Sequence, residues 1–354
     1  MSTGGTRDAA ALRDGLARWV AAHPGLVPVP DLRADAGAGG PAPAPAPEVV
    51  GVRHAEGGMA NETVVVETGP APGGFVVRLP PLEPTFPDYE LAPQALVQNA
   101  VAAAGVPAPS PAVVVDDERW IGSPFLAMPL LAGDIPGPAP AFDPYVDAAG
   151  PVGQRLLADG LLDTVAAVHA VPWQPAGLGD VLSGPRLHDA VERWAAYVAW
   201  ASDGAPLPAL SAALDWCERH VPAEREPVLL WGDVRLGNLV LDGERRVTGV
   251  LDWDLASIGP REMDLGWHLG LEFMMETLFG RRVPGFPGPA DALGRYERLT
   301  GYEARDMAWH EVFALVRALA INDRHQRIAG DPRRTENPMG PVLLARLESA
   351  ADES

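Results

Sequence analysis

Trp231-Gly232-Asp233-Val234-Arg235-Leu236-Gly237-Asn238, with Asp252 further along in Leu251-Asp252-Trp253-Asp254, is the stretch from which we predict the fold. Short apolar runs at 228–230, 239–241 and 247–251 predict strands, and Asp242-Gly243 is a turn signal between the last two. A hairpin of this kind brings Asn238 and Asp252 to the same open end, next to the loop that carries Asp233.

Asp233, Asn238 and Asp252 have the chemistry that phosphoryl transfer requires. Transfer from ATP depends mainly on positioning and on charge neutralisation around magnesium. Asp233 can accept the hydrogen bond of an attacking hydroxyl, while the oxygens of Asn238 and Asp252 suit Mg²⁺. The alternative is that Asp, Asn and Gly serve here only as turn and capping residues. The place of Asp252 at the end of an apolar run, and a Gly-rich stretch upstream, favour a nucleotide site.

Composition is typical of an enzyme with two lobes, since 354 residues suffice for two separate cores. The sequence has no apolar run long enough to span a membrane and no signal-peptide pattern, so we expect a cytoplasmic protein. A formal net charge of -20 argues against nucleic acid or an anionic membrane as a partner. The single cysteine, Cys217, excludes an intramolecular disulfide, and its helical pattern predicts a buried thiol.

The order of the patterns predicts an α+β fold. We expect an N-terminal helix and a Pro/Ala linker in residues 1–47, a β-rich nucleotide-binding lobe in 48–130 and a helical lobe in 131–354. Strand patterns occur at 49–53, 63–68, 75–79, 113–115 and 125–128. Helical patterns occur at 6–22, 91–104, 153–169, 188–201, 207–220, 265–279 and 307–329.

Taken in order, these motifs resemble those of the aminoglycoside phosphotransferase and choline kinase superfamily. They are most similar to bacterial phosphotransferases whose relatives also occur fused to acyl-CoA dehydrogenase-like domains. The resemblance covers most of the chain and rests on a Gly-rich turn at 57–63, a third strand at 75–78, a loop at 105–107, a hinge strand at 125–128, a catalytic loop at 231–238 and a metal-binding turn at 252–254. It implies a bilobal, protein-kinase-like fold and a small-molecule kinase that uses ATP or GTP with Mg²⁺.

The resemblance implies that the first lobe holds the nucleotide. Gly57, Gly58, Asn61 and Thr63 belong to the Gly-rich turn, whose backbone N–H groups can cradle phosphates. An ordinary hairpin turn is the alternative for this segment. Backbone groups from Met128 to Leu131 are expected to meet the base.

The chain departs from the family pattern because it contains no lysine. Arg78 stands at the position of the third-strand lysine, and a guanidinium can hold phosphate oxygens with two hydrogen bonds. The alternative is a solvent-facing strand arginine. The usual glutamate partner on the following helix is represented by either Glu90 or Gln94.

Other residues near the predicted loop have two interpretations each. Arg235 can neutralise charge on the transferred group, or form a salt bridge that holds the loop. Trp231 replaces a histidine that many members carry, and we expect its ring to brace the loop by packing. Asp264 is expected to cap a helix, and His169 resembles a structural histidine of the family. His310 and His325 are expected at the surface or in a substrate pocket.

The acceptor and the oligomeric state stay open at this stage. Aminoglycosides, other amino sugars, hydroxyacyl compounds, macrolides and choline-like molecules are all candidate acceptors. A second hypothesis is a catalytically impaired, kinase-like ligand-binding or regulatory protein, motivated by the missing lysine. A phosphate-releasing hydrolase is the third. The intact set of Asp233, Asn238 and Asp252 favours the enzyme.

Overall fold

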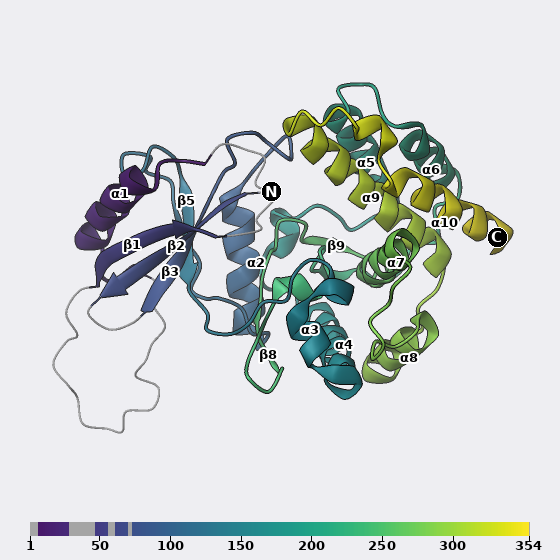
Figure 1. Ribbon diagram of the computed structural model, residues 1–354, viewed down its shortest axis with the longest axis horizontal. Coiled ribbons are helices and arrows are strands. Elements are labelled where there is room, and N and C mark those ends of the chain that lie inside the picture. The colour runs from purple at the N-terminus through teal and green to yellow at the C-terminus, as the bar shows by residue number, and fades with distance from the viewer. Residues whose placement is uncertain (1–5, 28–46, 56–60, 70–72, 354) are drawn as a thin grey trace. The chain divides into compact units, whose positions relative to one another are not determined.

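A computed structural model describes residues 6–27, 47–55, 61–69 and 73–353 of the chain (Figure 1). The chain divides into two compact units, of which unit 1 comprises residues 1–99 and 109–131, and unit 2 comprises residues 100–108 and 132–354. Strands and helices occur in both, which confirms the predicted α+β class. The predicted lobe boundaries at residues 48 and 131 stay predictions. Gly57 and Gly58 lie outside the described residues.

Unit 1 contains a five-stranded antiparallel sheet with the strand order β1-β2-β3-β5-β4. Its strands are β1 (Glu48–His54), β2 (Glu62–Gly69), β3 (Gly73–Leu79), β4 (Val113–Val115) and β5 (Phe125–Pro129). Each strand pattern expected in this region is confirmed to within two residues at either end. The apolar, Val- and Phe-rich segments explain the sheet, because the inner strands β2, β3 and β5 bury side chains on both faces, whereas β1 and β4 at its edges are partly exposed.

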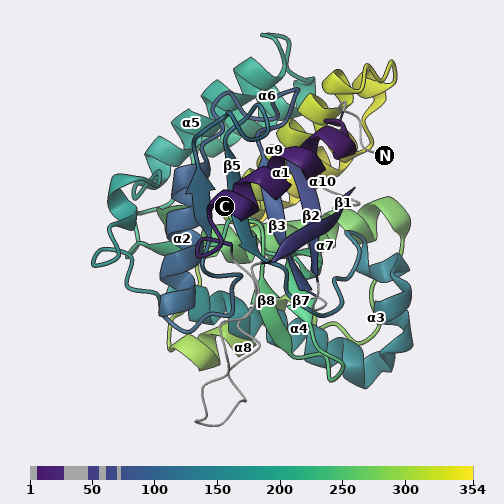
Figure 2. The same ribbon diagram turned by 90° about the vertical axis from the view of Figure 1, so that its left-hand side faces the viewer.

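Two helices cover the two faces of this sheet, as Figures 1 and 2 show. Helix α1 (Ala9–Ala22) packs on one face, where the ring of Trp19 lies 5.8 Å from Phe75 and 5.3 Å from Phe125 between ring centroids. Helix α2 (Leu91–Ala103) packs on the other face against a cluster that includes Leu126 and Met128. Side chains of a strand alternate between faces, so Arg78 of β3 points to the face opposite Phe75. That face is the one covered by α2.

Unit 2 is mainly helical. Its helices are α3 (Pro144–Ala148), α4 (Gly150–His169), α5 (Leu187–Ala201), α6 (Pro208–Arg219), α7 (Glu262–Phe279), α8 (Pro289–Thr300), α9 (Met307–Ile328) and α10 (Met339–Glu353). Two small antiparallel sheets pair β6 (Val228–Leu230) with β9 (Ser257–Gly259), and β7 (Leu239–Leu241) with β8 (Val247–Val250). The long helices and the strands β6 to β8 agree with the sequence patterns, whereas β9, α8 and α10 were not expected.

Glycines allow α7 and α9 to approach closely. A Cβ atom on Gly266 would lie 2.7 Å from the backbone of His310, a distance that real Cβ atoms do not reach. His310 is consequently enclosed between the helices and is 3% exposed. The prediction that His310 lies at the surface is wrong, because this helix crossing leaves it almost no access to solvent, and its place in a substrate pocket stays a prediction.

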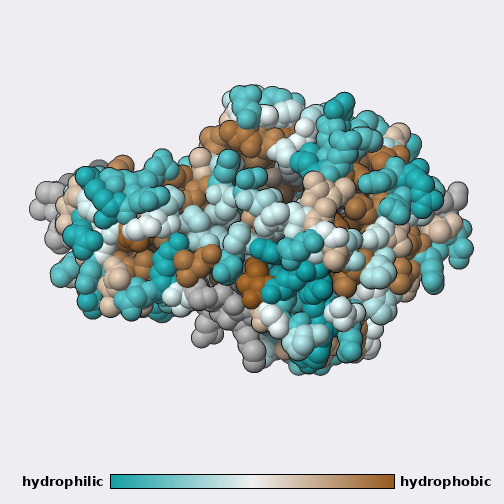
Figure 3. Space-filling model, turned by 90° about the horizontal axis from the view of Figure 1, so that it is seen from above, coloured by the Kyte–Doolittle hydropathy of each residue, from teal (hydrophilic) through white to brown (hydrophobic). Residues whose placement is uncertain are grey.

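The mixed character of the surface and the burial of the single cysteine agree with what the composition predicted. The face drawn in Figure 3 mixes hydrophilic and hydrophobic residues, as is normal for folded proteins. Across the described residues, we find no helix with the length and apolar character that a membrane span needs. Cys217 is fully buried on α6, as predicted, and burial raises the pKa of its thiol.

Candidate active site

A tight hairpin places the predicted metal-binding residues at one end of β7 and β8. Leu239 pairs with Val250 in the sheet, and the amide of Leu251 continues the ladder by donating to the carbonyl oxygen of Asn238 at 2.8 Å. Asp252 is the next residue. The sequence-based expectation that Asn238 and Asp252 meet at the open end of a hairpin is therefore confirmed. The strands hold this end in place because β7 is fully buried.

Three side chains hold the carboxylate of Asp233. The Nε of Arg235 donates to Oδ2 at 2.9 Å, and the Nδ2 of Asn238 donates to the same oxygen at 2.7 Å. The indole Nε1 of Trp267 donates to Oδ1 at 3.0 Å. Donors on both oxygens fix the orientation of the carboxylate, which is the condition for an acid–base group that must meet a substrate at a set angle.

The contacts of Asn238 determine which way its amide points. Nδ2 also donates to the main-chain oxygen of Asp233 at 3.0 Å, so both partners of this atom are acceptors. Only the NH₂ group can donate, so Oδ1 is left as the acceptor atom of the amide. Asp252 adopts a left-handed backbone with φ of 61°, a conformation that Asp tolerates better than most residues. An amide oxygen beside a carboxylate is a donor set that suits magnesium.

Arg235 lies between two carboxylates. Burial opposes its charged form, but the charge and hydrogen bond of Asp233 and the charge of Asp252 outweigh burial and raise the pKa of Arg235. The salt bridge between Arg235 and Asp233 was one of the two interpretations drawn from the sequence, and it is present. Arg235 thus supplies a fixed positive charge beside the carboxylates of Asp233 and Asp252.

Trp231 braces the loop by packing and by hydrogen bonds. Its side chain is fully buried, and its ring centroid lies 6.2 Å from that of Trp253. The indole Nε1 donates to the main-chain oxygens of Leu251 at 2.9 Å and Asp252 at 3.2 Å. Packing was expected from the sequence. The hydrogen bonds, which were not expected, tie the segments 231–238 and 251–254 directly together.

Asp264 holds the backbone of the same loop from α7. Its carboxylate is 1% exposed and accepts the N–H groups of Trp231 and Gly232, each at 2.8 Å. The Nε2 of His169 lies 3.1 Å from Oδ2. The prediction that Asp264 caps a helix is wrong, because the residue at the start of α7 is Arg261 and the Asp264 oxygens face the amides of the loop.

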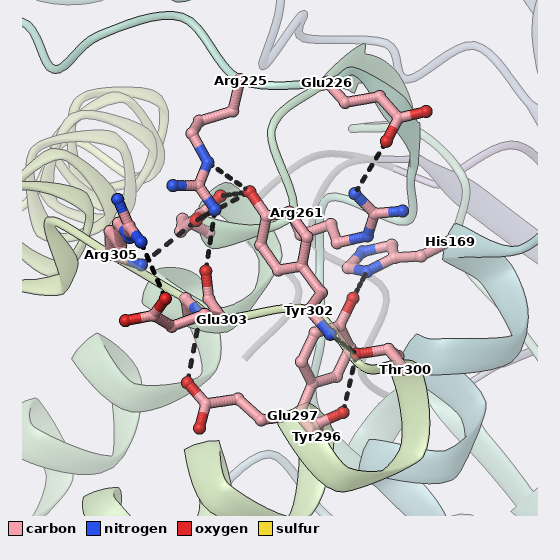
Figure 4. Close-up of polar contacts among 12 residues, drawn as sticks. His169, Arg225, Glu226, Arg261, Tyr296, Glu297, Thr300, Tyr302, Glu303 and Arg305 are labelled. Atoms are coloured by element: carbon pink, nitrogen blue, oxygen red, sulfur yellow. Dashed lines mark hydrogen bonds and ion pairs between the residues drawn. The ribbon is translucent and has the colours of Figure 1, made fainter.

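Figure 4 shows the polar contacts that hold the surroundings of α7. His169 points to Tyr296, with 2.6 Å between Nδ1 and the hydroxyl, so this histidine has a partner at each ring nitrogen. In the first turn of α7, Glu262 accepts the hydroxyl of Tyr302 at 3.0 Å. The ring of Tyr302 lies between the guanidinium groups of Arg225 at 4.7 Å and Arg261 at 4.4 Å. The start of α7, and with it Asp264, is therefore held firmly.

Arg78 is buried in unit 1 rather than exposed to solvent. It is 5% exposed and pairs in register with Thr63 on β2 and Leu126 on β5. Directly opposite residues share a face, so the side chains of Thr63 and Arg78 lie together on the α2 face of the sheet. Thr63 Oγ1 donates to Asn61 Oδ1 at 2.7 Å. The structure thus brings Asn61, Thr63 and Arg78 together, and the solvent-facing alternative for Arg78 is wrong.

The two candidate partners of Arg78 differ in burial. Gln94 is buried on α2, the helix that covers the Arg78 face, whereas Glu90 is exposed and precedes the helix. Because Gln94 is buried on the helix that covers Arg78, it is favoured over Glu90 as the partner of Arg78. In β5, Met128 is buried with its sulfur 3.4 Å from Gln98 Nε2, and Leu131, which follows the strand, is half-buried.

Comparison with known proteins gives the family. The sequence model of the phosphotransferase enzyme family matches residues 51–313, which include the Arg78 group of unit 1 and the Asp233 group of unit 2. The chain belongs to the phosphotransferase enzyme family. The resemblance that the motifs indicated is thereby confirmed.

Relatives of this phosphotransferase family member include acyl-CoA dehydrogenase family members. The chicken acyl-CoA dehydrogenase family member 11 is 27% identical over 231 residues, which is 64% of this chain and 29% of the relative. The human member 11 is 26% identical over 257 residues, which is 68% of this chain and 31% of the relative. The chain thus spans about a third of the length of these curated relatives.

Solved structures show the fold of this family member. A protein of Ralstonia eutropha, provisionally named an aminoglycoside phosphotransferase, aligns with a TM-score of 0.68 at 23% identity, covering 95% of this chain and 98% of that one. Spectinomycin phosphotransferase, solved with ADP and spectinomycin, aligns with a TM-score of 0.52 at 11% identity, covering 86% and 93%. These likenesses confirm the protein-kinase-like fold, with a β-rich first part and a mainly helical remainder.

Sequence reasoning missed part of the site in this phosphotransferase family member. Asp264 was assigned to a helix cap and Trp267 was not singled out, yet both contact the loop that carries Asp233. Their spacing was the available signal, because residues three apart on a helix share a face. Nothing in the local pattern, however, shows that this face of α7 meets the loop.

Proposed function

We propose that this chain transfers the γ-phosphoryl group of ATP or GTP to a hydroxyl group of a small molecule. The observation that carries the proposal is the carboxylate of Asp233, held on both oxygens by Arg235, Asn238 and Trp267. A turn residue or cap would not need three side-chain donors from two separate segments. Membership of the phosphotransferase family supports the proposal, as does the ADP bound to spectinomycin phosphotransferase.

Asp233 is assigned the role of catalytic base. Its carboxylate accepts the proton of the attacking hydroxyl, and its fixed orientation reduces the entropy that is lost on reaching the transition state. Arg235 stabilises the negative charge that the transferring group carries. The raised pKa of Arg235 ensures that this charge is present throughout the ordinary pH range.

Asn238 and Asp252 are assigned to magnesium. Oδ1 of Asn238 is the acceptor atom of its amide, and the carboxylate of Asp252 follows directly after the residue that pairs with Asn238. Both offer the hard oxygen ligands that the ion prefers. When bound, magnesium supplies neutralisation of the phosphate charge.

Unit 1 is assigned to the nucleotide. Arg78 takes the place of the missing lysine and contacts phosphate oxygens, with Gln94 as its orienting partner on α2. Asn61 and Thr63, which share a hydrogen bond, contribute to the phosphate site with Gly57 and Gly58. Backbone groups from Met128 to Leu131 contact the base.

The proposal is tested by an acceptor screen with the wild-type protein. The protein is incubated with magnesium and ATP or GTP, together with aminoglycosides, other amino sugars, hydroxyacyl compounds, macrolides and choline, and products are followed by ³¹P NMR and mass spectrometry. Formation of a phosphate monoester with one acceptor class supports the proposal. Release of inorganic phosphate alone, with every acceptor, would show a hydrolase instead. Nucleotide binding with neither product would show a ligand-binding protein.

A further inference from the structure

Arg317 of α9 is a buried cation placed directly behind the Asp233 loop. Its side chain is 3% exposed, and its guanidinium carbon lies 4.7 Å from the ring centroid of Trp267 on α7 and 5.0 Å from that of Trp194 on α5. Nη2 donates to the main-chain oxygen of Gly232 at 3.3 Å. One guanidinium thus contacts the residue before Asp233 and the indole that donates to Asp233.

Arg317 keeps its charge at neutral pH. Burial lowers the pKa of its guanidinium to about 10, while the charges of Asp264 and Asp233 act in the opposite direction. A protonated guanidinium within about 6 Å of an aromatic ring is attracted to the ring. Because Trp194 and Trp267 both meet this condition, the cation restrains the indole of Trp267 and with it the direction of its N–H group.

The donors around Asp233 are divided unequally between its oxygens. Within the part of the chain that the structure describes, Oδ2 accepts from Arg235 and from Asn238, whereas Oδ1 accepts from Trp267 alone. Each oxygen of a carboxylate has about two lone-pair sites for hydrogen bonds. Both sites of Oδ2 are therefore in use, and Oδ1 has one site left for a further donor.

We propose that Arg317 and Trp267 are positioning residues that orient Asp233 so that Oδ1 receives the proton of the acceptor hydroxyl. This inference rests on the proposed function. In the transfer, the hydroxyl oxygen forms a bond to the γ-phosphorus, and the bond from that phosphorus to the β,γ-bridging oxygen breaks. The electron pair of the broken bond stays with the nucleoside diphosphate, and the proton goes to Oδ1. Arg317 acts through Trp267 and Gly232 and does not itself touch the reacting atoms.

The contact itself is tested without turnover, by NMR of protein with ¹⁵N-labelled tryptophan. Trp267→Phe removes one indole resonance and so assigns it. Asp233→Ala and Arg317→Met are both expected to move that resonance in the otherwise wild-type protein. Arg324→Met is the matched control, because Arg324, also on α9, lies 4.4 Å over the ring of Trp200 on α5 and should move the resonance of Trp200 instead. A Trp267 resonance unmoved by Asp233→Ala would overturn the inference.

The positioning role is tested by kinetics with the acceptor found in the screen. Trp267→Phe keeps an aromatic ring for Arg317 but has no N–H, so kcat should fall about tenfold to a hundredfold while KM for the nucleotide stays near the wild-type value. Arg317→Lys, which keeps the charge, should retain more activity than Arg317→Met. Trp200→Phe should leave kcat unchanged.

Two outcomes separate this inference from the proposed function. Full kcat in Trp267→Phe, with an active wild type, would refute the positioning role and leave the phosphotransferase proposal intact. A wild type that transfers nothing to any acceptor would refute the proposed function and, with it, the catalytic part of the inference. The NMR result would then still report whether the contact exists.

Discussion

Replacement of Asp264 by asparagine should destabilise the protein although the two side chains have nearly the same shape. The carboxylate accepts two main-chain N–H groups through different oxygens, Trp231 through Oδ2 and Gly232 through Oδ1. An asparagine has one acceptor oxygen. If the amide oxygen takes the place of Oδ2, the hydrogen bond from the N–H of Trp231 is retained. The NH₂ group then faces the N–H of Gly232, so one buried donor is left without a partner.

The size of the effect follows from these contacts. A hydrogen bond to a charged group contributes about 1.5–3 kcal/mol, and an unsatisfied buried donor costs about 1–3 kcal/mol. The retained bonds also weaken when the charge is removed. We therefore expect Asp264→Asn to lower the free energy of unfolding by about 2–5 kcal/mol, a large part of the stability of an ordinary domain.

The matched control is Asp291→Asn. Asp291 lies in the first turn of α8, as Asp264 lies in the first turn of α7, but its side chain is exposed. Both substitutions remove one charge from the start of a helix, and the interaction with the helix dipole is the weaker one at the exposed Asp291. We expect Asp291→Asn to change the free energy of unfolding by less than about 0.5 kcal/mol.

Urea unfolding, followed by tryptophan fluorescence, measures the difference. Hydrogen exchange of the peptide that contains Trp231 and Gly232 provides a local readout, and exchange there should become faster in Asp264→Asn. A loss below about 0.5 kcal/mol, with unchanged exchange of that peptide, would refute the assignment of Asp264 as the anchor of the loop.

Three further predictions follow from single residues. Gly232→Ala should lower the free energy of unfolding by more than about 3 kcal/mol, because Gly232 has φ of 88° and a Cβ there would lie 2.1 Å from a main-chain oxygen. Gly243 lies in an open turn, so Gly243→Ala should be nearly neutral when both variants are compared by urea unfolding. Magnesium and ATP at about 100 times the dissociation constant should stabilise the wild type by about 2.7 kcal/mol in thermal unfolding, and this gain should vanish in Asp252→Ala; an equal gain without magnesium would contradict the metal assignment. Burial, with a smaller contribution from a nearby arginine charge, lowers the pKa of His310 from 6.5 to about 3, so the unfolded chain binds the proton more strongly and stability falls as the pH drops below 6.5. His310→Gln should reduce that slope by up to about 1.4 kcal/mol per pH unit in urea unfolding at a series of pH values.

Sequence patterns predicted the hairpin of the site because its signals are local. The buried run at Leu239–Leu241, the turn at Asp242 and the returning strand predict the hairpin, although not the register shift between Val240 and Leu241, and the pairing places Asn238 beside Leu251. Arg78 was singled out because the family resemblance implies a third-strand lysine at its position, which lies in β3. Strand alternation then accounts for its position on the face that α2 covers.

Contacts between distant segments were beyond the reach of such patterns. Asp264 carries the same local signal as a helix cap, and only the packing of α7 shows that its oxygens meet the loop amides. Helix α8 was missed because it is hydrophilic on average, although the two residues that it buries, Ala292 and Tyr296, recur at helical spacing. Helix α10 buries a charged residue, Arg346, which breaks the apolar pattern and pairs with Glu311 at 2.8 Å.

The central claim is that Asp233 accepts the proton of the hydroxyl that is phosphorylated. Its most direct test compares nucleotide binding, by calorimetry, with the single-turnover rate of transfer in the wild type and in Asp233→Asn, with Asp215→Asn on the exposed side of α6 as the control. We predict that Asp233→Asn binds magnesium and ATP as the wild type does but transfers the phosphoryl group about 10²–10⁴ times more slowly, while Asp215→Asn is unaffected. Transfer by Asp233→Asn at the wild-type rate would contradict the account.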